Sequence, residues 1–183
     1  TIVFITHDLN EAMRLGDRIA VLKDGRVAQI GTGPEILHEP ADEYVSGAVA
    51  DVDRSRVLTA EQAMRRPRKT FGVDADPRQV LDWLDENEAN GVYILDSEDR
   101  IVGVARDDRL ARGIKDGVAD IRKLVTDDYA GAQPSTPLAE LAGLAAMHTV
   151  PVAVIDEFGH LRGVVPRAHL LAALSGEEGE IRG

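Results

Sequence analysis

The hydrophobic and polar positions of the first fifty residues predict short strands and helices in alternation. The unbroken apolar run at residues 2–5 predicts a strand buried on both faces, so the chain begins inside an expected element. Asp8 is expected to cap a helix that runs to about Leu15. A hairpin with Asp24-Gly25 as its turn follows, and another short helix is expected to begin at Thr32.

A repeat with an offset of 60 residues organises most of the remaining chain. Each copy predicts a helix, a short strand, a helix, a strand, an acidic turn, a strand and a helix. We therefore expect two repeats, at residues 57–113 and 114–174, after a first unit at residues 1–56. Each repeat is too small to bury much surface alone, so the two should pack together. Residues 175–183 are expected to form a flexible acidic tail. The identical pairs are Pro77/Pro137, Leu81/Leu141, Val92/Val152, Asp96/Asp156, Gly103/Gly163 and Leu110/Leu170.

The composition excludes several classes of function. The 183 residues carry a formal net charge of −11, which argues against nucleic-acid binding. There is no cysteine, so disulfides and thiolate metal sites are excluded. The five histidines lack metal-ligand spacing, and we predict no metal site. No apolar run is long enough for a membrane span.

The charge is unevenly distributed along the chain. Residues 54–69 hold six cations and one acid, whereas residues 72–100 hold nine acids and two arginines. Two solvated faces would account for this pattern. The alternative is a salt-sensitive contact of the basic segment with an anionic membrane or with an acidic surface of the repeats.

The first unit resembles the C-terminal end of an ABC-transporter ATPase. The resemblance rests on the sequence THDLNEAMRLGDRIAVLKDG at residues 6–25, where His7 would be the histidine of the switch, or H-loop. The continuations PADEYV and DVDRSRVL, within residues 40–58, are similar to the ATPase subunit of glycine betaine/proline betaine importers. This resemblance implies that His7 positions the γ-phosphate of ATP in the intact enzyme. Taken alone, His7 could instead be a helix-entry residue held by nearby backbone.

The sequence lacks the other parts that such an ATPase needs. There is no G-x-x-x-x-G-K-[ST] loop, no magnesium-binding acid at the end of an apolar run and no signature motif. The resemblance therefore implies a C-terminal piece of a longer ATPase that uses ATP and Mg²⁺. We expect the chain alone not to hydrolyse ATP. It also implies a membrane permease subunit as partner and a cytoplasmic position at the inner face of the membrane.

The repeats resemble a tandem pair of CBS (cystathionine-β-synthase) domains, an α+β fold of two β-α-β-β-α-type units. The resemblance rests on VYILD with IVGV and on VAVID with LRGV. It implies a homodimer and clefts that bind an adenine nucleotide or cyclic di-AMP. The usual Gly-apolar-x-Ser/Thr-x-x-Asp pattern is altered, because Arg106 and Arg109 occupy the polar positions in the first copy, and Pro166 and His169 in the second.

No carboxylate is present to accept a ribose, which argues against ordinary AMP or ATP binding. Arg106 and Arg109 suit phosphate recognition instead, and His169 is the corresponding candidate in the second copy. Arginines solvated at a helix start are the alternative.

Together these features predict a regulatory region of an osmoprotectant importer ATPase that senses ionic strength or a nucleotide and mediates dimer contact. A stand-alone CBS sensor of small molecules and a ligand-free dimerisation scaffold are the alternatives. A stand-alone sensor should have an independent, well-packed domain at residues 1–50.

Overall fold

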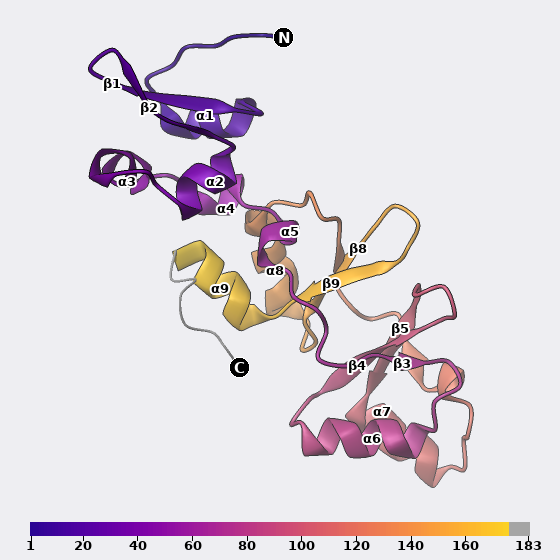
Figure 1. The fold of residues 1–183 in the computed structure, drawn as a ribbon. Helices are drawn as coiled ribbons and strands as arrows, with labels where there is room; N and C mark the ends of the chain where they lie inside the picture. Colours follow the sequence, from indigo (N-terminus) through magenta and orange to yellow (C-terminus); the bar gives the residue numbers. More distant parts are fainter. Residues whose placement is uncertain (176–183) are drawn as a thin grey trace.

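The computed structural model describes residues 1–175 as a chain of three packed parts. An N-terminal unit is followed by two repeats, each with a small sheet and flanking helices (Figure 1). The second repeat lies between the N-terminal unit and the first repeat, because α4 packs against the helices of the second repeat. No helix among these residues combines the length and the apolar character needed to cross a bilayer.

The helices and the hairpin predicted for the N-terminal unit are present. The Asp8 carboxylate accepts a hydrogen bond from the Glu11 N–H and caps the first helix. Asp24 and Gly25 adopt the left-handed backbone of the hairpin turn, with φ of 50° and 75°. The elements are α1 (Leu9–Leu15), β1 (Ile19–Lys23), β2 (Arg26–Gly31), α2 (Gly33–His38), α3 (Glu43–Val49) and α4 (Arg54–Val57).

The prediction of a strand at residues 2–5 is wrong. These residues form no regular secondary structure, and Ile2 and Ile5 are 94% and 91% exposed. An apolar run becomes a buried strand only when neighbouring strands pair with its backbone and other elements cover its faces. The N-terminal unit supplies only the β1–β2 hairpin, and that hairpin does not pair with this segment.

The two repeats form the sheets β3-β4-β5-β6 and β7-β8-β9. In each sheet the first strand runs parallel to the second, and the third runs antiparallel to the second. The strands are β3 (Phe71–Gly72), β4 (Gly91–Leu95), β5 (Ile101–Arg106), β6 (Val125–Thr126), β7 (Gly131–Ala132), β8 (Val152–Ile155) and β9 (Leu161–Val165). The helices are α5 (Ala60–Ala63), α6 (Pro77–Glu86), α7 (Asp107–Lys115), the 3₁₀ turn η1 (Ile121–Lys123), α8 (Leu138–Met147) and α9 (Arg167–Ser175).

The 60-residue offset is visible in the local geometry of the two hairpins. Asp96 and Asp156 each accept two backbone N–H bonds from the turn that follows. Asp99 and Gly159, which are 60 residues apart, both adopt positive φ. Helix α8 departs from the offset, because its buried positions lie 61 residues after those of α6, as with Val80 and Leu141.

Each repeat's sheet is completed by a segment beyond its own hairpin. β6 pairs with β5 in the first sheet. At the same edge of the second sheet, the Arg65 N–H donates to the Val164 carbonyl at 2.8 Å and the Val164 N–H donates back at 2.9 Å. The linker between the N-terminal unit and the first repeat is therefore attached to the second repeat.

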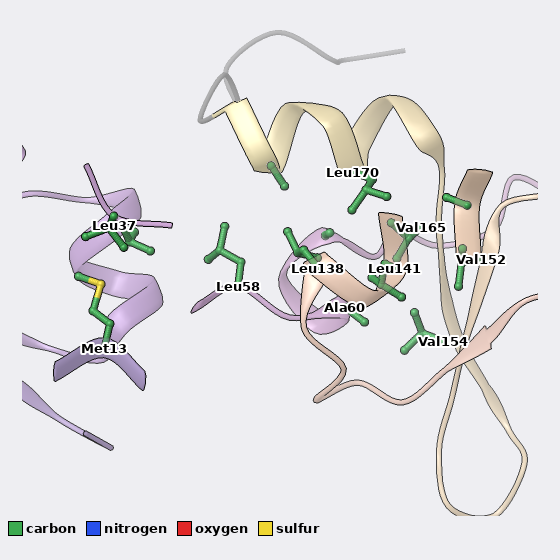
Figure 2. Packing of buried hydrophobic residues seen from close by; sticks show 14 of the residues in the cluster. Met13, Leu37, Leu58, Ala60, Leu138, Leu141, Val152, Val154, Val165 and Leu170 are labelled. Carbon is green, nitrogen blue, oxygen red and sulfur yellow. The ribbon is translucent and has the colours of Figure 1, made fainter. Parts of the chain in front are cut away.

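The buried residues among 1–175 form three clusters, and two of these join different parts of the chain. One of the two, the junction cluster, runs from Met13 and Leu37 in the N-terminal unit, through Leu58, to Leu138 and Leu170 in the second repeat (Figure 2). Another cluster lies inside the first repeat, and the last joins the faces of the two repeats. The N-terminal unit thus shares its core with the second repeat instead of forming an independent domain.

Candidate functional site

His7 lies on an exposed segment immediately before α1. The backbone around it is fixed, because the Asp8 N–H donates to the Thr6 hydroxyl oxygen at 3.0 Å and that hydroxyl donates to Glu11 at 2.8 Å. Within residues 1–175 the His7 imidazole has no hydrogen-bond partner. The side chain is therefore free to contact a group outside this part of the chain.

A hollow of about 470 Å³ lies between the His7 segment and the start of α4. His7 and Glu11 line one wall, and Asp53 and Arg56 line the other. The Asp53 N–H donates to the Asn10 side-chain oxygen at 3.0 Å, so the two walls are directly connected. The segment that carries His7 is thus held against the linker to the repeats.

Arg106 connects the two repeats at the end of β5. Its guanidinium donates to the Thr149 hydroxyl at 2.9 Å, to the Asp128 carbonyl at 2.7 Å and to the Asp128 carboxylate at 3.1 Å. The side chain is only 20% exposed, and its buried Nε has no hydrogen-bond partner in the described part of the chain. Arg106 is therefore not a solvated residue at a helix start, and its guanidinium already binds groups of the protein.

Two tyrosines also lie at this contact between the repeats, which we call the seam. The Tyr93 hydroxyl donates to the Pro151 carbonyl at 2.7 Å, and its ring meets Tyr129 edge to face with centroids 5.6 Å apart. Burial raises the pKa of Tyr93, so the hydroxyl remains a neutral donor. His148 Nδ1 lies 3.6 Å from the Asp128 carboxylate at the rim of the seam.

The structure does not bring the three candidate ligand residues together in one set of contacts. Arg109 is exposed on α7 and has no partner within residues 1–175. His169 is partly buried on α9, and its Nδ1 has no hydrogen-bond partner among the residues that the structure describes. Sequence reasoning missed Asp128 and Thr149, the partners of Arg106, because they lie 22 and 43 residues away without a motif that connects them.

The cations of the basic linker, residues 65–69, are exposed or contact uncharged groups. Lys69 lies over the Phe71 ring, with its nitrogen 5.1 Å from the centroid, and Arg68 reaches the Asn87 side chain at 3.5 Å. Among residues 1–175 the Arg65 guanidinium donates only to the Met64 carbonyl, and Arg66 is exposed. In the described part of the chain no carboxylate pairs with any of these four cations. No cluster of three potential metal ligands occurs in residues 1–175 either.

Comparison with known proteins supports both resemblances. The CBS domain family model matches residues 118–176. The chain is 38% identical over 178 residues to the glycine betaine/carnitine transport ATP-binding protein GbuA of Listeria monocytogenes and to the glycine betaine transport ATP-binding protein OpuAA of Bacillus subtilis. These matches cover 97% and 96% of the chain but 45% and 42% of the relatives. The chain therefore spans less than half the length of these relatives.

Solved structures show the same fold. Staphylococcus aureus OpuCA superposes with a TM-score of 0.54 at 17% identity and covers 63% of this chain and 97% of its own. CBSX2 in complex with AMP has a TM-score of 0.56 at 23% identity, covering 66% and 99%. CbpB in complex with c-di-AMP has a TM-score of 0.57 at 16% identity, covering 64% and 85%.

These likenesses agree with the geometry of the repeats. The 60-residue offset and the two similar sheets confirm the predicted α+β fold of a CBS-domain pair. The identity to the transport proteins extends over the N-terminal unit as well, because it covers nearly the whole chain. Over nearly its whole length the chain is therefore similar to part of the ATP-binding proteins of glycine betaine and proline betaine ABC transport systems, and its second repeat matches the CBS domain family.

Proposed function

We propose that this chain is the regulatory region of the ATP-binding subunit of an osmoprotectant importer, and that it couples the CBS pair to the His7 segment. The junction cluster carries this proposal. Leu58 and Leu138 are fully buried in it, and Met13 of α1 belongs to the same cluster. Close-packed interiors transmit displacement because they contain few voids. A movement of the second repeat would therefore shift α1 and the histidine that precedes it.

In the intact ATPase, His7 would hydrogen-bond the γ-phosphate of ATP, which Mg²⁺ accompanies. Its imidazole is exposed and has no partner within residues 1–175, which fits that role. The residues of this chain do not form a phosphate-binding loop, so they do not fit the nucleotide and metal by themselves. His7 would then contribute orientation and charge to a site completed by other residues.

The signal that this region senses is, in our proposal, ionic strength. The cations of residues 65–69 have no carboxylate partner within residues 1–175, and each cation near an anionic membrane contributes about 1 kcal/mol. The Debye length falls from about 10 Å at 0.1 M salt to about 3 Å at 1 M, so such contacts weaken as salt rises. Release of the linker would act directly on the sheet edge where Arg65 meets Val164.

This role implies particular partners and a particular position in the cell. It would work as a homodimer at the cytoplasmic face of the membrane, beside a membrane permease subunit. The permease would supply the transport path, and the paired ATP-binding subunits would supply hydrolysis. The chain's own contribution would be regulation and dimer contact.

Vesicle flotation of the chain tests the signal. We expect binding to vesicles of anionic lipid at about 0.05 M salt, loss of binding at about 0.5 M, and little binding to zwitterionic lipid. Replacement of Arg66, Arg68 and Lys69 by Gln should abolish the binding. A matched triple variant on α7, which changes Arg109, Arg112 and Lys115 to Gln, should bind normally. Equal losses in both variants would contradict a role specific to the linker.

A nucleotide signal is the second candidate, favoured by the two arginines at the start of α7 and by the nucleotide complexes of proteins with the same fold. The position that carries the ribose-binding Asp in the usual pattern holds Arg109 in the first repeat and His169 in the second, and the Asp128 carboxylate at the seam already accepts a hydrogen bond from Arg106. Thermal shift with AMP, ATP and cyclic di-AMP tests this candidate. A shift that Arg109→Gln abolishes would support nucleotide sensing. Absence of both lipid and nucleotide binding would favour a ligand-free dimerisation scaffold.

A further inference from the structure

Helix α1 begins with a wider set of hydrogen bonds than the start of α2. In α2, the Thr32 hydroxyl accepts the Glu35 N–H, and the Glu35 carboxylate accepts the Thr32 N–H at 2.8 Å, which is the ordinary capping box. In α1, Asp8 is the cap, and Glu11 holds the position that Glu35 holds in α2. Here the Glu11 carboxylate accepts the Thr6 hydroxyl, and that hydroxyl oxygen accepts the Asp8 N–H. The box is therefore extended by two residues on its N-terminal side.

This extended box encloses His7. Its two neighbours in the chain are both held to Glu11, because the Thr6 hydroxyl donates to the Glu11 carboxylate at 2.8 Å and the Asp8 carboxylate accepts the Glu11 N–H at 3.2 Å. Within residues 1–8, Thr6 is the one residue that is not exposed. The backbone on both sides of His7 is thus fixed to α1, while the imidazole itself lies at the surface.

Helix α1 is also connected to the linker by a polar contact. The Asn10 side-chain oxygen accepts the Asp53 N–H at 3.0 Å. In the described part of the chain this is the only hydrogen bond between residues 1–15 and residues 51–58. Asp53 begins α4, because its carboxylate accepts the Ser55 N–H and hydroxyl, and α4 packs against α8 and α9. A displacement of the second repeat therefore reaches α1 through Asn10 as well as through the apolar core.

We propose that Thr6 and Glu11 are positioning residues for His7, and that Asn10 makes the position of this group depend on the linker. The inference rests on the proposed function, in which His7 acts on the γ-phosphate in the intact ATPase, and it names the side chains that carry regulation to that histidine. Phosphoryl transfer depends mainly on positioning and electrostatics, so a displacement of about 1 Å can lower the rate by about 100-fold. Thr6 and Glu11 act through His7 in this role and need not touch the nucleotide.

The stability of α1 by itself does not require the Thr6 contacts. The Asp8 carboxylate already caps the helix, and Leu9 and Met13 hold its apolar face against the junction cluster. The hydroxyl of Thr6 lies outside the helix and outside that face. Its two hydrogen bonds act on the residues that flank a histidine without a partner in residues 1–175, so they fix the direction in which that histidine leaves the backbone.

NMR relaxation of the backbone amides of the chain tests this arrangement. The His7 amide should have an order parameter of about 0.85, as in rigid backbone, and Thr6→Val should lower it below about 0.6. Thr6→Ser keeps the hydroxyl and should preserve the rigid value. Asn10→Leu should speed solvent exchange of the Asp53 amide about ten-fold, as expected for the loss of one hydrogen bond. A mobile His7 amide in the wild type, equal order parameters in wild type and Thr6→Val, or an unchanged Asp53 amide in Asn10→Leu would overturn the inference.

Kinetics of the intact ATP-binding subunit test whether the contacts act through the histidine. Thr6→Val should lower kcat about ten-fold or more with little change in the KM for ATP, and Thr6→Ser should retain the wild-type kcat. In a His7→Ala background, Thr6→Val should have no further effect. Additive losses would indicate a separate structural role and would overturn the inference alone. A His7→Ala subunit with wild-type kcat would overturn the proposed role of His7 and the inference with it.

The salt dependence of kcat tests the part assigned to Asn10. Asn10→Leu should lose most of the salt dependence that the wild-type subunit shows, because the linker then lacks its polar contact with α1. A wild-type salt dependence that persists in Asn10→Leu would overturn this part of the inference. A wild-type subunit without salt dependence would instead overturn ionic strength as the signal in the proposed function, and the Thr6 variants would still report on the positioning of His7.

Discussion

The substitution Leu58→Ala tests whether the N-terminal unit and the second repeat share one cooperative core. Leu58 is fully buried in the junction cluster, between Leu37 on one side and Leu138 on the other (Figure 2). Its carbonyl accepts the Leu138 N–H at 3.0 Å, which holds the backbone in place and limits collapse around a smaller side chain. Truncation of a buried leucine costs about 2–5 kcal/mol, and more where the site cannot relax, so we expect a value in the upper half of this range.

Hydrogen exchange, read by mass spectrometry, can assign this loss to particular elements. Leu58→Ala should speed exchange in α1–α3 and in α8–α9 together, because both groups of helices pack on the same cluster. The control is Leu110→Ala, a truncation of equal size at a fully buried position in the core of the first repeat. It should speed exchange in α6 and α7 and leave α1–α3 unchanged. If Leu58→Ala loosened the second repeat while α1–α3 kept wild-type protection, the proposed mechanical coupling would be refuted.

Three other predictions concern the repeats. Arg106→Met should lower the free energy of unfolding in urea by about 1–3 kcal/mol, because it removes the hydrogen bonds that a largely buried guanidinium donates to Thr149 and Asp128, whereas Arg109→Met, at an exposed position, should change it by less than about 0.5 kcal/mol; equal effects of the two substitutions would contradict a stabilising role of the Arg106 contacts. The backbone hydrogen bond from Arg100 lowers the pKa of Asp96 below its ordinary 3.8, so this carboxylate stabilises the fold above that pH and the contribution is lost as pH falls through the lower folded pKa. Asp96→Asn should therefore destabilise at pH 7 more than at pH about 3, and a loss independent of pH would count against this assignment. Gly91→Ala would place a Cβ 2.8 Å from a valine methyl carbon of the second repeat, so it should destabilise by about 1–3 kcal/mol, and an unchanged urea midpoint would show that the repeats yield at this contact.

The features that sequence reasoning predicted correctly depend on neighbouring residues. The hairpin turn needs a left-handed backbone, which Asp24-Gly25 supplies, and the acidic turns need a carboxylate at Asp96 and Asp156 to accept nearby N–H groups. Because these rules act over a few residues, their repetition at a fixed offset is readable without a structure. The same holds for the CBS-pair fold that the repetition predicts.

The incorrect prediction and the missed residues depend on distant parts of the chain. The apolar run around Phe4 reads as a strand, yet a strand forms only when another backbone pairs with it. The sequence alone suggests that Arg106 is a solvated cation or a phosphate ligand, because no neighbouring residue indicates its contacts with Asp128 and Thr149. The one-residue shift of α8 is equally hidden, since Leu81 and Leu141 are identical but lie at different depths.

In the proposed function, ionic strength acts on the N-terminal unit through the path of the linker. Helix α5 connects Leu58, which is locked in the junction cluster, to Arg65, which is attached to the second sheet by two backbone hydrogen bonds. The cations that have no acidic partner among residues 1–175 begin at that attachment, so a force on them acts on a sheet edge only two residues from Ala63 of the junction cluster. Two hydrogen bonds contribute roughly 1–3 kcal/mol, which is comparable to the attraction of a few cations to an anionic surface. Because the two free energies are similar, the proposed function predicts that a change in salt decides whether the linker stays on the sheet.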